Sequence, residues 1–159
     1  SPGIFWSASE DGTVRQFDIR VPHVCSGDCR DTLFVDLRLG DSAATKTAIE
    51  IKSVATNRIF PMQLAVGAED PFVRVYDRRQ LPSKSQPCRR FAPTHLASNR
   101  QRGMRSVHIT HVDFSHRGSE VIASYHGDHV YTFTVASPDD YCQMEPVPAV
   151  PVDNAPLPS

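Results

Sequence analysis

Residues Phe5–Arg20 read F-W-S-A-S-E-D-G-T-V-R-Q-F-D-I-R, and a second segment of the chain repeats their pattern. That segment, Leu64–Arg79, reads L-A-V-G-A-E-D-P-F-V-R-V-Y-D-R-R. Each segment runs from an apolar start through small residues to an acid and a turn, and then ends in Val-Arg-x-aromatic-Asp-x-Arg. The turn aspartates, Asp11 and Asp70, are 59 residues apart. Self-similarity at a fixed spacing predicts a repeat architecture.

A third and weaker copy lies at Val121–Val135, V-I-A-S-Y-H-G-D-H-V-Y-T-F-T-V. It keeps the small residues, the turn and the alternation, but it places Thr134 at the position of the final aspartate. Since the strand alternation repeats in phase, we expect Val14, Val73 and Val130 to be buried at equivalent positions.

Short runs of alternating polar and apolar residues cover most of the first 135 positions. We expect strands at Ile4–Ser9, Thr13–Ile19, Leu33–Leu39, Ala48–Thr56, Gln63–Ala68, Phe72–Asp77, Val107–Ser115, Glu120–Tyr125 and Val130–Val135. Gly12 is expected in the first hairpin turn, where glycine adopts a positive φ at low cost. No helical periodicity is present. Short strands at regular spacing indicate an all-β sandwich, barrel or propeller.

A basic insertion, residues 78–106, interrupts this pattern with eight Lys and Arg residues and no acid. We interpret it as a long loop with a short strand near Cys88–Ala92. One interpretation is a solvated insertion, and the other is a patch for an acidic or phosphorylated protein partner. The residues of such a patch are Lys84, Arg89, Arg90, Arg100, Arg102 and Arg105. Phe91 is the only aromatic residue there, which disfavours stacking with nucleic-acid bases.

The segment 136–159 contains six prolines and four acids but no Lys or Arg. Such a composition buries too little apolar surface to offset its ordering entropy, so we expect a disordered linker or tail. The chain begins with Ser1 directly before a strand-like segment, and we therefore expect it to be part of a longer protein.

Composition excludes several classes of protein. The net charge of −1 gives no global attraction to nucleic acid or membrane, and no run of about 18 apolar residues or signal peptide is present. The four cysteines lack the density of a small secreted domain. We expect a reducing compartment, that is, a nuclear and/or cytoplasmic protein with no membrane partner.

Candidate catalytic and metal-binding residues are few. His23, Cys25 and Cys29 crowd one loop at a spacing that zinc sites use, but no second pair of ligands follows at a usual distance. A Gly-rich phosphate loop and a Ser-His-Asp order are both missing. We expect a protein without catalytic residues, metal or cofactor.

The pattern small-x-acid-turn-Val-Arg-x-aromatic-Asp resembles the second half of a WD repeat, the blade unit of β-propellers, with Phe17 and Tyr76 in place of Trp. Over Ile4–Val135 the sequence is similar to the family of the WD and tetratricopeptide repeats protein and the cullin-4-associated substrate receptors. This resemblance implies an all-β fold: a partial WD-repeat propeller of about three blades over residues 1–135. The Gly-His pair that opens a WD repeat is missing, and a closed ring needs about four to eight blades.

In WD-repeat substrate receptors of cullin-4 ubiquitin ligases, aromatic-Asp-x-Arg ends the box that docks on the damage-specific DNA-binding adaptor. The resemblance therefore implies adaptor docking through Phe17, Asp18, Arg20, Tyr76, Asp77 and Arg79, with an unknown protein as the ligase substrate. The first box departs from the family at Gln16, where an apolar residue is preferred.

Two alternatives stay open at this stage. Each Asp-x-Arg can be a local surface salt bridge that contributes about 0–1 kcal/mol. The chain is then a general WD-repeat scaffold that binds acidic or phosphorylated partners through its basic insertion.

Overall fold

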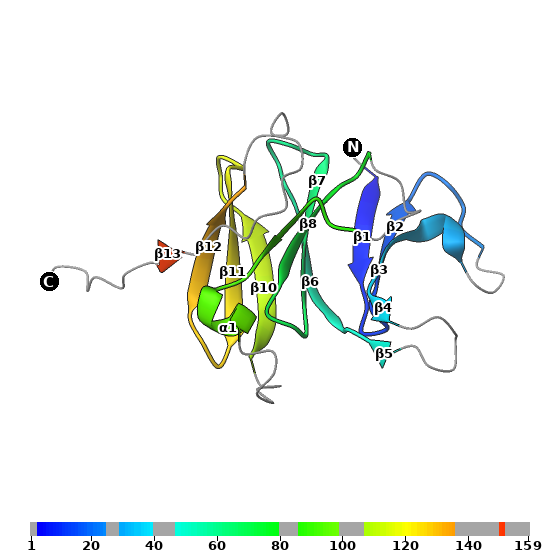
Figure 1. Cartoon of the computed structure of the whole chain (residues 1–159). Helices are drawn as coiled ribbons and strands as arrows, with labels where there is room; N and C mark the ends of the chain where they lie inside the picture. The colour runs from blue at the N-terminus through cyan, green and yellow to red at the C-terminus, as the bar shows by residue number, and fades with distance from the viewer. Residues whose placement is uncertain are drawn as a thin grey trace, which may run out of the picture.

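The computed structural model describes residues 3–24, 29–39, 47–79, 86–98, 107–135 and 150–151. These residues form three antiparallel sheets of three or four strands and one two-stranded ribbon (Figure 1). The all-β fold predicted from the sequence is therefore confirmed. Within the described residues, no helix has the length and apolar character needed to cross a membrane.

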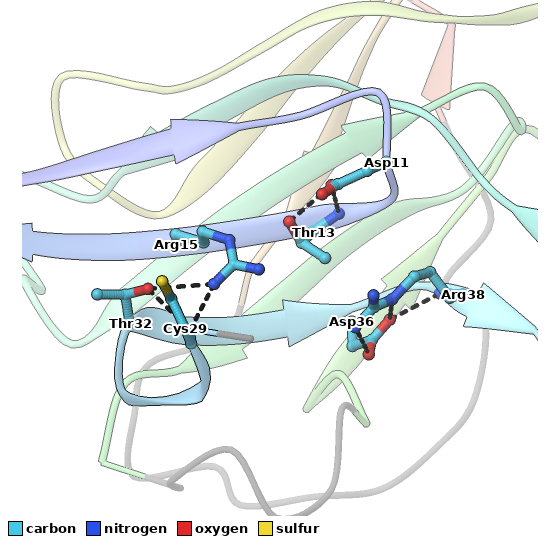
Figure 2. Close-up of polar contacts among 7 residues, drawn as sticks. All are labelled: Asp11, Thr13, Arg15, Cys29, Thr32, Asp36 and Arg38. Atoms are coloured by element: carbon cyan, nitrogen blue, oxygen red, sulfur yellow. Dashed lines mark hydrogen bonds and ion pairs between the residues drawn. The ribbon is translucent and has the colours of Figure 1, made fainter. Parts of the chain in front are cut away.

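The first sheet has the strand order β1-β2-β3. Its elements are β1 (Ile4–Ala8), β2 (Thr13–Asp18), the short 3-10 helix η1 (Arg30–Thr32) and β3 (Leu33–Asp36). In the turn between β1 and β2, the Asp11 carboxylate accepts hydrogen bonds from the backbone N–H and the hydroxyl of Thr13, at 2.9 and 2.6 Å (Figure 2). Gly12 occupies this turn with a φ of 81°, as predicted.

The second and third sheets each contain four strands in chain order. The second comprises β6 (Ile51–Thr56), β7 (Gln63–Ala68), β8 (Val73–Asp77) and β9 (Arg89–Phe91). The third comprises β10 (His108–Phe114), β11 (Glu120–His126), β12 (Val130–Thr134) and β13 (Val150–Pro151). The ribbon of β4 (Arg38–Leu39) and β5 (Thr47–Ala48) joins the first sheet to the second. The three copies of the sequence pattern thus fall on three separate sheets.

The basic insertion contains one strand and one short helix within its described part. Strand β9 lies where the sequence predicted a strand, and helix α1 (Thr94–Ser98) is an additional short element that the sequence did not predict. The N–H groups of Leu96 and Ala97 donate to the Pro93 carbonyl at 3.0 and 2.9 Å, so the helix is a single turn. Five residues are too few to show a helical period in the sequence.

Two apolar clusters hold the sheets together, one on each face of the second sheet. Because side chains alternate along β7, Leu64 and Val66 point into the cluster with Val14 of the first sheet. Ala65 points to the other face, into the cluster with Val121 of the third sheet. Strand β7 is therefore buried on both faces.

The burial of the three equivalent valines is confirmed for two of them and wrong for the third. Val14 and Val73 are fully buried, but Val130 is 51% exposed. The buried residue in the third copy is Tyr131, which is 4% exposed. In the first two copies the buried valine follows the turn aspartate by three positions. The turn aspartate of the third copy is Asp128, and three positions after it stands Tyr131, not Val130.

The same shift changes which residue takes the place of the final aspartate. In the first two copies the aspartate follows the turn aspartate by seven positions, and in the third copy this position is Val135, not Thr134. Val135 is 3% exposed and belongs to the apolar cluster. The third sheet therefore has a buried aliphatic side chain where the other two have a carboxylate.

Two residues of the predicted tail form a strand. Val150–Pro151 make up β13, which pairs with Tyr131 and Thr132 of β12. Since β12 would otherwise present unpaired backbone groups, a short strand can dock on its edge. The sequence predicted disorder for the whole tail, and for these two residues the prediction is wrong. The remaining tail residues lie outside the described residues.

Candidate functional site

Strand β2 ends in a pair of side chains that bind each other closely. Arg20 donates to the Asp18 carboxylate three times: from its backbone N–H at 3.0 Å, from Nε at 2.8 Å and from Nη2 at 2.5 Å. A carboxylate that binds the backbone two residues further on stops a strand and starts a turn. The Arg20 side chain is 63% exposed. Its hydrogen bonds lower the pKa of Asp18 to about 2.

Strand β8 ends in the same arrangement. Arg79 donates to Asp77 from its backbone N–H at 2.9 Å, from Nε at 3.1 Å and from Nη2 at 2.6 Å. Its side chain is 52% exposed, whereas the Asp77 side chain is 11% exposed. The aspartate in each pair thus anchors a guanidinium group that faces the solvent.

Both pairs lie at the same end of neighbouring sheets. Strands β2 and β8 run toward the same edge, at the top of Figure 1. Arg78, between Asp77 and Arg79, donates from Nη2 to Oε1 of Gln16 at 3.3 Å, and Gln16 precedes Asp18 by two positions. The two exposed arginines therefore belong to one surface.

A third pair of the same kind was missed in the sequence. Arg38 donates to Asp36 from its backbone N–H at 3.0 Å, from Nε at 2.8 Å and from Nη2 at 2.6 Å (Figure 2). Asp36 pairs with Thr13 at the start of β2, so this pair lies at the opposite end of the first sheet. The Asp-x-Arg spacing was visible in the sequence, but Val35 stands where the other copies have an aromatic residue.

The two aromatic residues of the predicted docking boxes differ in position. Phe17 stacks on Phe5 across β1 and β2 with ring centroids 5.1 Å apart, and Phe5 is 49% exposed. Tyr76 is 5% exposed and lies 6.5 Å from the ring of Phe34, inside the core. Burial raises the pKa of Tyr76 to about 12. Phe17 is thus half-buried beside an exposed ring, whereas Tyr76 lies in the core.

Only part of the predicted acidic-partner patch is described. Arg89 and Arg90 lie on β9, and the guanidinium carbon of Arg90 is 3.5 Å from the ring centroid of Phe72. The other four residues, Lys84, Arg100, Arg102 and Arg105, lie outside the described residues. The described part therefore places one arginine of the patch over an aromatic ring at the sheet edge.

The residues considered for zinc do not come together in the described part of the chain. No group of three or more His, Cys, Asp or Glu side chains able to hold a metal ion occurs there. His23 packs edge-on against Phe17 with ring centroids 5.6 Å apart, and Cys25 lies outside the described residues. Cys29 is disulfide-bonded, whereas Cys88 is not part of a disulfide. The carbonyl of Cys29 accepts a hydrogen bond from Arg15 Nη1 (Figure 2).

Comparison with known proteins confirms the resemblance to WD-repeat proteins. The chain is 40% identical over 154 residues to Protein ALTERED SEED GERMINATION 2 of Arabidopsis thaliana, covering 85% of this chain and 20% of the relative. It is 36% identical over 143 residues to the mouse DDB1- and CUL4-associated factor 6, covering 83% of this chain and 14% of the relative. It is 28% identical over 158 residues to the mouse WD and tetratricopeptide repeats protein 1, covering 83% of this chain and 22% of the relative.

The chain thus spans between 14% and 22% of the length of these relatives. No protein-family model matches it. The similarity extends over most of the chain and supports a role in protein interaction.

Proposed function

Since the chain matches WD-repeat proteins over most of its length, we propose that it is a non-catalytic protein-interaction module within a substrate receptor of a cullin-4 ubiquitin ligase. It docks on the adaptor DDB1 through Arg20 and Arg79. The observation that carries this proposal is the presence of two Asp-x-Arg pairs with the same geometry at the same end of neighbouring sheets. The name of one relative, DDB1- and CUL4-associated factor 6, supports the identity of the adaptor.

The geometry of each pair suits an interface. The aspartate holds the guanidinium plane in one orientation, so less conformational entropy is lost when a partner binds. More than half of each arginine side chain is open to a partner. An exposed ion pair contributes only about 0–1 kcal/mol to folding, whereas a central interface arginine typically contributes about 2–4 kcal/mol to binding.

Arg38 provides a matched control within the same chain. It makes the same three contacts with its aspartate, but it lies at the opposite end of the first sheet. A partner that covers Arg20 and Arg79 at one end does not reach Arg38 at the other. Arg38→Ala therefore removes an Asp-x-Arg pair without touching the proposed docking surface.

The test is co-precipitation of DDB1 with the full-length protein, with circular dichroism as the folding control. We expect the variant with Arg20→Ala and Arg79→Ala to lose DDB1 and Arg38→Ala to retain it. Arg79→Lys should weaken binding nearly as much as Arg79→Ala, because lysine lacks the bidentate fork. A folded double variant that retains DDB1 at the wild-type level would refute the proposal.

The remaining partners and the location also belong to this proposal. The ligase substrate is an unknown protein, no cofactor is required, and the protein acts in the nucleus and/or cytoplasm.

A second candidate function is a WD-repeat scaffold for acidic or phosphorylated partners. It is favoured by the exposed Arg90, which stacks on Phe72. Substituting Arg89 and Arg90 by Ala should spare DDB1 binding and weaken only the capture of an acidic partner.

A further inference from the structure

Arg78 points away from the arginine that follows it. Whereas Arg79 folds back onto Asp77, the Arg78 side chain crosses from the second sheet to the first. Its Nη1 donates to the carbonyl of Pro61 at 2.9 Å, and its Nη2 donates to Oε1 of Gln16 at 3.3 Å. Its backbone N–H donates to the carbonyl of Met62 at 2.7 Å. One guanidinium group therefore joins the turn between β6 and β7 to strand β2.

The aromatic ring of Trp6 completes this contact. The guanidinium carbon of Arg78 lies 4.8 Å from the ring centroid, within the range of a cation–π interaction. Trp6 and Gln16 are paired across β1 and β2, so Arg78 binds both strands of the first hairpin. The Nε of Arg78 is buried and has no hydrogen-bond partner among the described residues. The guanidinium group therefore lies inside the joint, that is, the contact region between the first and second sheets.

The joint between the second and third sheets lacks an equivalent contact in the described residues. At the positions that correspond to Gln16 and Trp6, the second sheet has the apolar residues Val75 and Ala65. In the first copy the position of Arg78 is taken by Ile19, which is 73% exposed. The Arg78 contact is thus specific to the joint between the two sheets that carry the exposed Asp-x-Arg pairs. It also accounts for Gln16, the polar residue at a position where the WD-repeat pattern prefers an apolar one.

We infer that Arg78 is a positioning residue, which fixes the first sheet against the second so that Arg20 and Arg79 contact one partner at the same time. This inference rests on the proposed docking function. Two contacts on one rigid surface bind more tightly than either alone, because the second contact forms at a high effective concentration. If the joint is loose, that gain is reduced by the cost of ordering the two sheets.

The first test measures the affinity of the full-length protein for purified DDB1. We expect Arg78→Ala to weaken binding by on the order of 10-fold or more, although Arg78 itself does not touch the adaptor. In the wild type, Arg20→Ala should cause a large loss of affinity for DDB1. In the Arg78→Ala background, the same substitution should cause a much smaller loss of affinity. Arg78→Lys keeps the charge but cannot donate to both acceptors, so it should restore binding only in part. Arg38→Ala, at the opposite end of the first sheet, should leave the affinity unchanged.

The second test is amide hydrogen exchange of the same variants without DDB1. Arg78→Ala should speed exchange in peptides that cover β1, β2 and the turn before β7, and leave peptides of the third sheet unchanged. Unchanged exchange, or faster exchange with wild-type affinity for DDB1, would overturn the positioning role. Equal losses from Arg20→Ala in both backgrounds would also overturn it. If DDB1 binding does not depend on Arg20 and Arg79, the proposed function fails, and exchange alone then decides whether Arg78 holds the two sheets together.

Discussion

Asp18 reports on the state of its arginine through its own titration. Hydrogen bonds from Arg20 lower the pKa of Asp18 to about 2, from an ordinary value of 3.8. We expect Arg20→Ala to raise this pKa most of the way, because the side-chain hydrogen bonds are lost while the backbone N–H still donates. NMR titration of the carboxyl carbon measures the change. A pKa that stays near 2 in the variant would show that Arg20 is not the cause.

The sign of the accompanying pH dependence follows from linkage. A carboxyl group with a depressed pKa stabilises the folded state above its unfolded pKa and loses that contribution as the pH falls through the folded value. For Asp18 this window runs from about pH 4 down to about pH 2. The difference in Tm between the wild type and Arg20→Ala should therefore shrink across this window. A difference in Tm that stays constant over this window would contradict the linkage.

At the scale of elements, Gly67 determines how closely β7 approaches β10. A Cβ atom added to Gly67 would lie 2.4 Å from Cγ2 of Ile109 and 3.0 Å from Cγ1 of Val112. Both neighbours are fully buried, so they have little space to move into. We expect Gly67→Ala to lower the free energy of unfolding of the full-length protein by about 1–3 kcal/mol, as overpacked cores do. Urea unfolding measures this, with Thr132→Ala of β12 as the control, and a loss below that of the control would contradict the close packing.

The strands themselves could be predicted because the pattern occurs three times. The alternation around Gly12 and the spacing of Asp11 and Asp70 placed both hairpins correctly. The third copy was aligned one residue early, since Tyr131 fills the buried position that valine fills elsewhere. Tyrosine and valine can both fill a buried strand position, but a pattern that searches for valine does not recognise tyrosine there.

The Asp-x-Arg pairs could be predicted only where an aromatic residue marked them. Asp36 and Arg38 have the same geometry without an aromatic neighbour, so a search for the full pattern passes over them. The contact of Arg78 with Gln16 and Trp6 was beyond reach for a different reason. It depends on how two sheets pack face to face, and local alternation carries no information about that.

At the scale of the whole molecule, the three sheets depend on each other for burial. Stability in repeat folds comes largely from the interfaces between neighbours, and β1 is an edge strand among the described residues with Phe5 half-exposed. We expect residues 1–159 on their own to melt broadly and to associate as concentration rises. Calorimetry and sedimentation measure both properties, with the full-length protein for comparison. A sharp two-state transition of a monomer would contradict this expectation.

The double burial of β7 also bears on the order in which a ribosome delivers the chain. The first hairpin, with Val14 on its inner face, leaves the exit tunnel well before Leu64 and Val66, which cover that face in the folded protein. Chains fold from the N-terminus as they are made, so the apolar side of this hairpin stays exposed until β7 has been synthesised. Synthesis of β7 buries that side and, through Ala65, also provides the apolar surface on which the third sheet later packs. Slow translation between the two segments would lengthen the interval in which a chaperone has an apolar surface to bind.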